Sequence, residues 1–341
     1  MILNCDSAQQ EMFLNYKFDS INIKNFSITN DDEEIKYIPG KTYLFATFAA
    51  FGHTLLDVYG QYKVLQLKYS DIKPFFFENS SKGYLFNNNK VSQDILNVLG
   101  YTPNDIKNIS EGNYLFEEII LFFDMNNTFP ESFYSSKGIT RTSHYFPFCS
   151  CYMGSENCGE GEYFKYNYLA IDLIVKSFSN VFSKDKTEKY FISRERYNNQ
   201  YKKEIDYFSL KNNLSLEEEQ QFYRAKIRYC ENEKQIQEIF IKNGYSVVYP
   251  EDHGLFDQIK MFSSAKNIAS ISGASLFNIL WGNSGTQIFE ILSVPGYRYH
   301  YKEFANQVNV KHTYINIINY TIKDATNKIL KIISNTEYDI L

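Results

Sequence analysis

The sequence has few of the features that mark secreted, membrane-spanning or nucleic-acid-binding proteins. Its 341 residues carry 35 basic and 40 acidic side chains, a net charge of -5, without an obvious basic face. Because binding to a phosphate backbone needs clustered Lys and Arg, nucleic acid is excluded as the main partner. No apolar run has the length of a membrane span, and the start of the chain lacks the regions of a signal peptide. We therefore expect a cytoplasmic protein with no integral membrane segment, while peripheral membrane contact stays open.

Cysteine is also scarce, at five residues, and the odd number does not fit a disulfide framework. Cys149, Cys151 and Cys158 form a local cluster, with His144 just upstream. Three thiols and an imidazole could make a structural zinc site, but one residue between the first pair is a tighter spacing than usual and a second knuckle is missing. The sequence favours a loop of reduced thiols and leaves metal binding at this cluster as the alternative.

Carboxylate pairs framed by apolar residues are lacking too. The dense run Asp31-Asp32-Glu33-Glu34 lies in a polar stretch, which is typical of a solvated loop and not of a metal clamp. The sequence predicts neither a catalytic metal nor a cofactor.

The chain is long enough for about two domains, and a hydrophobic fraction of 44% is ample for their cores. Its second half alternates short β-rich runs with amphipathic stretches, after a polar, charge-mixed segment that reaches about residue 228. Strands are predicted at residues 190–193, 246–249, 267–271, 287–291 and 313–318, and helices at 231–242, 255–265, 276–281, 301–307 and 321–334. Such alternation implies a doubly wound parallel sheet, whose ligands bind at the carboxyl ends of the strands.

The first half is less regular. Strands are predicted at residues 43–48 and 115–123, helices at 53–65 and 92–99, and a loop-like segment at 123–162. We place the domain boundary after that loop, which gives domains of residues 1–160 and 161–341. The closing helix could pack back on the N-terminal domain.

The stretch Ser270 to Asn278 is the best candidate for a ligand site. A strand that runs into Ser272-Gly273-Ala274-Ser275 and then a helix brings bare backbone N–H groups to one point, which favours an anionic phosphate. Gly273 permits close approach, and the two serine hydroxyls can cap the helix or donate to phosphate oxygens. Taken alone, the pattern also fits an ordinary turn of small residues.

Several further motifs flank this stretch in a fixed order. They are the strand Tyr190 to Arg194, Arg228 with Asn232-Glu233, Gly244 to Glu251, Gln258-Ile259, the strand ending in Glu290, and Phe51 to Asp57 in the first half. In this order they resemble the catalytic domain of glycosyltransferase family 61, over about residues 43–67 and 189–293. Two features depart from the family: Ser272 stands where His is common, and the segment 198–221 is longer and more charged than usual.

The resemblance implies an α/β fold of two facing doubly wound, Rossmann-like domains, the GT-B type, with the active site in the cleft between them. It also implies an inverting mechanism without an essential metal. We expect transfer of a sugar from a nucleotide-diphosphate donor, with UDP-sugars favoured, to a hydroxyl of a glycan or glycoprotein.

An inverting transfer needs a base for the acceptor hydroxyl and polar or cationic groups for the departing diphosphate. His53, at a helix start after a strand, is the candidate base, although local backbone could equally satisfy it. Asp57, one turn on, could orient His53 or act as the base itself.

The donor side is predicted in the C-terminal half. Arg194 and Arg228 are the candidates for gripping the diphosphate, together with the turn formed by Ser272, Gly273, Ala274 and Ser275. Asn278 and Gln258 are placed near the base or sugar, and Glu290 near the ribose hydroxyls.

Other basic and imidazole groups receive no role. Arg196 and Arg224 are expected to be surface charges. His144, His253, His300 and His312 lack convincing partners in the sequence.

Two alternative functions differ in how well the sequence fits them. A hydrolase of the α/β type needs Gly-x-Ser-x-Gly at its nucleophile, which residues 272–276 do not supply. A non-catalytic nucleotide-sugar-binding module, or a degenerate transferase, stays open because of Ser272.

Overall fold

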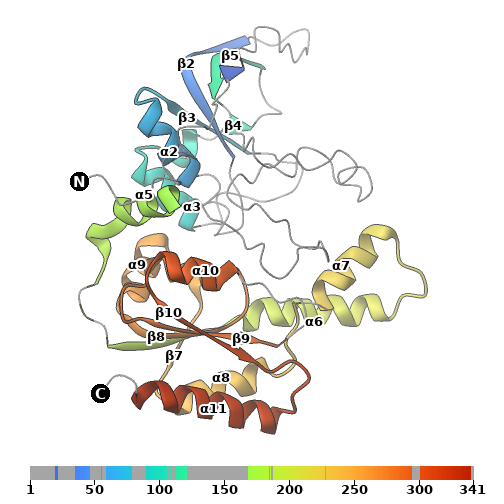
Figure 1. Ribbon diagram of the computed structural model, residues 1–341. Helices are drawn as coiled ribbons and strands as arrows, with labels where there is room; N and C mark the ends of the chain where they lie inside the picture. Colours follow the sequence, from blue (N-terminus) through green and yellow to red (C-terminus); the bar gives the residue numbers. More distant parts are fainter. Residues whose placement is uncertain are drawn as a thin grey trace. The chain divides into compact units, whose positions relative to one another are not determined.

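The computed structural model describes residues 20–21, 35–46, 55, 59–78, 90–105, 107–108, 113–120, 168–183, 185, 187–226, 228–293 and 300–338 (Figure 1). The chain divides into two compact units, Met1–Lys176 and Ser177–Leu341. The domain boundary predicted near residue 160 lies outside the described residues and stays a prediction. Both units are α/β, and each has a sheet of its own.

The first unit holds a sheet in the order β1-β5-β2-β3-β4. Its strands are β1 (Ser20–Ile21), β2 (Ile35–Ala46), β3 (Lys73–Glu78), β4 (Lys107–Asn108) and β5 (Asn113–Ile120). β2, β3, β4 and β5 pair in parallel, whereas β1 runs antiparallel to β5. The sheet is therefore mixed, with one antiparallel edge strand beside four parallel ones.

The helices of this unit partly match the prediction. They are α2 (Gln61–Lys68), α3 (Lys90–Val98), the 3-10 turn η4 (Pro103–Asp105) and α5 (Tyr168–Phe178), which ends just beyond the division between the units. The helix predicted at 92–99 is α3, and the strand predicted at 115–123 corresponds to β5. The regular part of the helix predicted at 53–65 begins only at Gln61.

The second unit holds a wholly parallel sheet in the order β10-β9-β8-β6-β7. Its strands are β6 (Glu188–Ile192), β7 (Ser246–Val248), β8 (Ala265–Ile271), β9 (Gln287–Leu292) and β10 (Lys311–Asn316). Every strand predicted in this half overlaps one of them. Numbered from β6, the order is 2-1-3-4-5 when read from β7, the flavodoxin-like form of the doubly wound sheet.

Helices cover both faces of this sheet (Figure 1). One face carries α8 (Glu233–Lys242) and α11 (Ile322–Tyr338), which contact each other. The other face carries α9 (Leu255–Ser263), the 3-10 helix η9 (Ala274–Trp281) and α10 (His300–Gln307). The closing helix predicted at 321–334 is α11, and it packs on α8 and β10 of its own unit.

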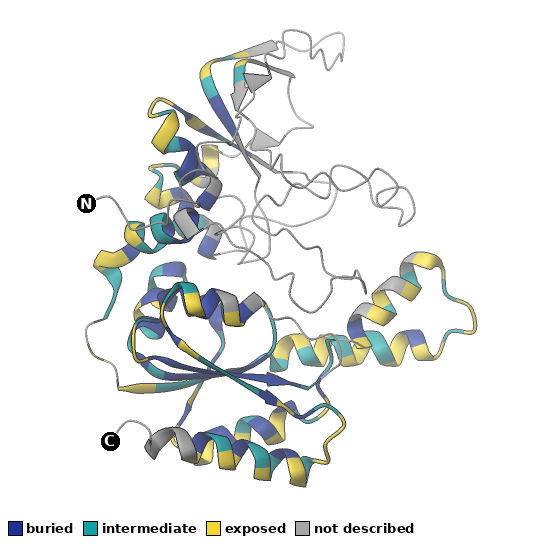
Figure 2. Ribbon diagram, in the orientation of Figure 1, coloured by how far each residue is buried: buried dark blue, intermediate teal, exposed yellow. Residues whose placement is uncertain are grey.

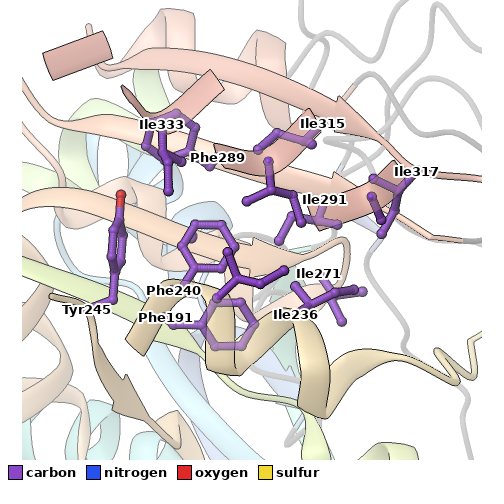
Figure 3. Packing of buried hydrophobic residues seen from close by; sticks show 14 of the residues in the cluster. Phe191, Ile236, Phe240, Tyr245, Ile271, Phe289, Ile291, Ile315, Ile317 and Ile333 are labelled. Carbon is purple, nitrogen blue, oxygen red and sulfur yellow. The ribbon is translucent and has the colours of Figure 1, made fainter. Parts of the chain in front are cut away.

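The core explains why the sequence forms this sheet. Alternate strand residues point to opposite faces, and both faces are buried, so all six residues of β9 are buried. On the α8 and α11 face, Phe191, Phe289 and Ile315 meet Phe240 and residues of α11 (Figure 3). Each such side chain contributes about 1.5–3 kcal/mol by leaving water.

The segment before α8 forms a helical hairpin, which the sequence analysis treated only as polar and charge-mixed. Its two helices are α6 (Glu195–Ser209) and α7 (Leu216–Lys226), joined by a short loop. Phe208 of α6 is buried against Phe222 of α7, with ring centroids 6.1 Å apart. Most other hairpin residues are exposed or half-buried, and the hairpin extends away from the sheet of its unit (Figure 2).

Within the described ranges, no helix has both the length and the apolar character needed to cross a bilayer. The same part of the chain has no group of three or more His, Cys, Asp or Glu side chains arranged to hold a metal ion.

Candidate functional site

The strand order of the second unit defines where a ligand would bind. β6 lies between β7 and β8, so the chain leaves β6 toward one side and later returns to its other side. At such a switch point the two connections diverge and leave a crevice at the carboxyl ends of the strands. Arg194 follows β6, and Ser272-Gly273 follows β8, so these predicted site residues flank the switch point.

Arg194 spans the two strand ends. Its Nη1 donates a hydrogen bond of 2.5 Å to the carbonyl oxygen of Ser272. Its guanidinium forms no ion pair with any carboxylate in the described part of the chain. A guanidinium held by one carbonyl, without an ion pair in these ranges, leaves donors available for an anionic ligand.

Gly273 lets the Arg194 side chain lie against the turn. A Cβ atom at this position would come within 3.0 Å of the Cζ and Nη1 atoms of Arg194. The φ angle of Gly273 is 170°, extended backbone that any residue can adopt. A side chain at position 273 would therefore have to displace the guanidinium, although the backbone itself does not demand glycine.

The turn after β8 leads from the strand into a helical segment, η9, but the N–H of Ser272 is already used within the unit. The backbone N–H of Ser272 donates to the Ile291 carbonyl, and that of Leu276 donates to Gly273. Ala274 is exposed at the start of η9. The Ser275 hydroxyl oxygen is buried without a hydrogen-bond partner among the described residues, so it can serve a ligand.

Glu233 belongs to this site, although the sequence analysis assigned it no role. One of its carboxylate oxygens, Oε1, accepts a 2.5 Å hydrogen bond from the backbone N–H of Arg194. Glu233 is 3% exposed, and burial raises the pKa of its carboxyl group, while that hydrogen bond and the Arg194 charge oppose the rise. The sequence signal that could have indicated this role is the position of Glu233 beside Asn232, at the start of a predicted helix.

Two other arginines differ sharply from Arg194. Arg196 forms a bidentate ion pair with Asp252, at 2.5 and 2.7 Å, and half of its side chain is exposed. Arg228 donates only a long 3.5 Å hydrogen bond to the hydroxyl of Tyr201, and no carboxylate pairs with it in the described ranges. Arg196 is thus committed to Asp252, whereas Arg228 retains free donors.

Asn278 and Gln258 are engaged inside the unit. The Asn278 side chain donates to the Ser275 carbonyl and accepts a 3.1 Å hydrogen bond from the indole of Trp281. The Gln258 amide donates to the carbonyls of Pro250 and His253. Both side chains are at least 97% buried, so their contacts stabilise local structure.

Glu290 was predicted to end its strand and to lie near the ribose hydroxyls, and the structure differs in its position and in its partner. It lies within β9, which continues to Leu292, and does not end the strand. Its Oε2 lies 3.0 Å from Nε2 of His312 on β10, and both side chains are buried. The expectation that His312 lacks a partner is therefore wrong, because the adjacent parallel strand brings the two side chains together.

Several candidates fall outside the described residues. These are the predicted base residues His53 and Asp57, the cluster of Cys149, Cys151, Cys158 and His144, and the acidic run 31–34. Their predicted roles stay predictions.

The fold and the residues at the switch point together indicate the class of protein. A doubly wound parallel sheet, with an arginine and a glycine turn at its switch point, is typical of α/β proteins that bind nucleotides or other phosphates. The family model Glycosyltransferase 61 matches residues 51–289, more than half of the chain. The chain belongs to glycosyltransferase family 61 and is a glycosyltransferase, as its motifs predicted. No curated protein matches the sequence.

Proposed function

We propose that the protein is an inverting glycosyltransferase that moves a sugar from a nucleotide-diphosphate donor, UDP-sugars being favoured, to a hydroxyl of a glycan or glycoprotein. The family supplies the transferase activity. The donor type, the acceptor, the inversion, the GT-B arrangement and the cytoplasmic location are parts of the proposal.

One observation carries the assignment of the donor to the second unit. The Arg194 side chain reaches across the switch point to Ser272 and is packed on Gly273, and its guanidinium forms no ion pair among the described residues. A diphosphate placed there would accept hydrogen bonds from the remaining guanidinium N–H groups. Such charge-assisted bonds are roughly twice as strong as neutral ones.

Three further residues are proposed for the donor side. The Ser275 hydroxyl lacks a partner in the described part of the chain and lies on the same turn. Arg228, whose one hydrogen bond among the described residues is a long one to Tyr201, would supply a second cation. Glu233 acts as a positioning residue, because it holds the backbone from which the Arg194 side chain extends.

We propose a structural role for Gln258, Asn278 and Glu290 in place of the predicted base, sugar and ribose contacts. The amide donors of Gln258 and Asn278 are used within the unit. Glu290 faces His312 inside the sheet.

The acceptor side is proposed in the first unit. His53, as general base, would take the proton of the acceptor hydroxyl as that oxygen attacks the anomeric carbon and the nucleoside diphosphate leaves. Asp57 would orient the imidazole. Such a base typically contributes 10²- to 10⁴-fold to the rate.

A screen of nucleotide-sugars for released nucleoside diphosphate tests this proposal. Turnover of at least one donor is expected, with the opposite anomeric configuration in the product and no loss after strong chelation. Nucleotide binding without turnover of any donor or acceptor would favour the non-catalytic module. Loss on chelation, restored by Mn²⁺ or Mg²⁺, would contradict the metal-free mechanism.

A further inference from the structure

The start of α6 carries an exposed aromatic ring next to the proposed diphosphate site. Arg194 is the N-cap residue of α6, and Tyr197 and Tyr201 follow it three and seven residues later. Residues at this spacing lie on one face of a helix, one above the other. One face of α6 therefore carries the guanidinium of Arg194 and, over the next two turns, two tyrosine rings.

Tyr197 is the tyrosine of this face whose polar group and ring are not engaged. The residue is 49% exposed, and its hydroxyl forms no hydrogen bond to another described residue. No aromatic ring or cation stacks on it within the described ranges. The hydroxyl of Tyr201, in contrast, accepts the 3.5 Å hydrogen bond from Arg228.

The helix start that carries Tyr197 is held in place by its neighbours. The hydroxyl of Tyr249 donates a 3.1 Å hydrogen bond to Glu195, and the guanidinium of Arg196 lies 4.8 Å from the centroid of the same ring. Arg196 is itself paired with Asp252. These contacts fix the beginning of α6 against the turn after β7, so a ligand that packs on Tyr197 meets a fixed surface.

A carboxylate lies close to the Tyr197 ring. Partial burial and the neighbouring Glu251 and Tyr201 raise the pKa of Tyr197, whereas the charges of Arg194 and Arg196 oppose the rise. Glu251 is 26% exposed in its side chain, and its Oε1 is 3.8 Å from Nη1 of Arg196, which is a long ion pair. Its carboxylate therefore keeps acceptor capacity for hydroxyl groups of a ligand.

An accessible ring beside a carboxylate suits a neutral sugar. One face of a sugar ring consists of C–H groups, which pack on an aromatic side chain, while the sugar hydroxyls donate to carboxylate oxygens. The negative charge of Glu251 disfavours a further phosphate at this place. Tyrosine also offers a large contact area at a low cost in conformational entropy.

The exposure of Tyr197 favours the acceptor over the transferred sugar. A sugar in transit has to be shielded from water, because water would otherwise hydrolyse the donor. An acceptor glycan arrives from solvent and can lie on an open surface. The helix α6 also leads away from the sheet (Figure 1) and carries a second exposed tyrosine, Tyr207, at 57%. The surface thus has room for several sugars.

We propose that Tyr197 and Glu251 form an acceptor platform that binds a neutral glycan, an inference that rests on the proposed function. The Tyr197 ring packs on the C–H face of one acceptor sugar, and Glu251 accepts hydrogen bonds from its hydroxyls. Arg194, one turn back along α6, stays with the diphosphate. The platform adds to the base proposed for the acceptor hydroxyl, and it narrows the acceptor to a glycan.

The test is an NMR titration of the full-length protein with neutral tetrasaccharides of glucose, xylose, mannose and N-acetylglucosamine. UDP, GDP, ADP, CDP and the preferred nucleotide-sugar are titrated beside them. Tyr197→Ala is compared with Tyr197→Phe, which keeps the ring, and with Tyr223→Ala, which removes a 67% exposed ring of α7 outside the platform.

Tyr197→Ala should weaken binding of the preferred tetrasaccharide by roughly two- to tenfold, the range for one aromatic contact. Glu251→Ala should weaken it by a similar factor, because a hydrogen-bond acceptor is lost. Tyr197→Phe and Tyr223→Ala should bind the tetrasaccharide as the wild type does. Affinity for the nucleoside diphosphate and the melting temperature should be the same in all four variants.

The possible failures are distinguishable. If the wild type binds a nucleoside diphosphate but no tetrasaccharide, or if Tyr197→Ala binds the tetrasaccharide equally well, the platform is wrong and the donor function stands. If Tyr197→Ala weakens only the nucleotide-sugar, the ring contacts the transferred sugar and the acceptor assignment is wrong. If the wild type binds neither nucleotides nor tetrasaccharides, both proposals are wrong.

Discussion

Arg194 and Arg196 are two residues apart, yet their guanidinium groups have different partners. The guanidinium of Arg194 lies at the switch point and forms no ion pair among the described residues, whereas that of Arg196 is held by Asp252. Because sequence shows only that both are arginines near a strand end, the distinction depends on which carboxylates the fold brings close.

Arg194→Ala should weaken binding of the nucleoside diphosphate by about 1.5–3 kcal/mol, the value of a hydrogen bond to a charged group. Arg196→Ala is the matched control and should change affinity little, because its charge is already paired. Arg228→Ala should lie nearer to Arg194→Ala. Titration of the three variants with UDP measures this, and equal affinity for Arg194→Ala and the wild type would remove the proposed phosphate site.

Glu233 leads to a prediction about pH. Burial raises the pKa of its carboxyl group above the ordinary 4.5, so the native state binds its proton more tightly than the unfolded chain does. The stability that this proton contributes is complete below pH 4.5 and is lost as the pH rises through the raised pKa.

Glu233→Gln has no such proton to lose and keeps an oxygen for the Arg194 N–H. Its melting temperature relative to the wild type should therefore rise between pH 4 and pH 7.5. Thermal unfolding at a series of pH values measures the difference. A constant difference across that range would show that the carboxylate is not penalised by burial.

At the scale of single elements, the sheet of the second unit was the most predictable part. Its strands are short and rich in β-branched and aromatic residues, and each is separated from the next by an amphipathic stretch. The hydrophobic period and the segment length therefore indicate the same type of element. The hairpin of α6 and α7 was missed because its helices bury little against the core, which leaves a weak apolar pattern. Residue pairs across strands, such as Glu290 and His312, depend on register, which the sequence does not show.

The Glu290–His312 pair links β9 to β10 inside a buried layer. The other carboxylate oxygen of Glu290 and Nδ1 of His312 are buried without hydrogen-bond partners among the described residues. Removing one member leaves an uncompensated buried group, which is more costly than removing both.

His312→Leu should therefore lower the free energy of unfolding by about 3–5 kcal/mol, whereas the double variant with Glu290→Met should recover most of that loss. Denaturant unfolding of both variants, beside the wild type, gives the coupling between the two residues. Nucleotide affinity serves as the second readout. A loss of affinity in Glu290→Gln at unchanged stability would restore the ribose contact that the sequence analysis predicted.

At the scale of the whole molecule, the two units differ in what each is proposed to do. The second unit carries Arg194 and the turn at Gly273, while His53 and Asp57 belong to the first. The residues of the proposed base lie outside the described ranges, so this assignment still depends on the sequence resemblance.

His53→Ala should leave nucleotide affinity nearly unchanged and lower turnover by roughly 10²- to 10⁴-fold, the range for a lost general base. Asp57→Asn should cause a smaller loss if Asp57 only orients the imidazole. Steady-state kinetics with the preferred donor, beside binding titrations, separate the two effects. The reverse order would make Asp57 the base, and full turnover in both variants would place the base elsewhere.

The position of β6 between β7 and β8 also has a consequence for how the protein is made. β6 is the first strand of the second unit, yet one of its neighbours is β8, and the contact from Ser270 to Ile192 spans 78 residues. Contacts so distant in sequence slow folding, since a long loop must close before they form. During synthesis, β6 leaves the ribosome long before β8, so one of its two edges has no strand partner until β8 emerges. The nascent chain is therefore expected to be most prone to aggregation in that interval, before residue 271 has emerged.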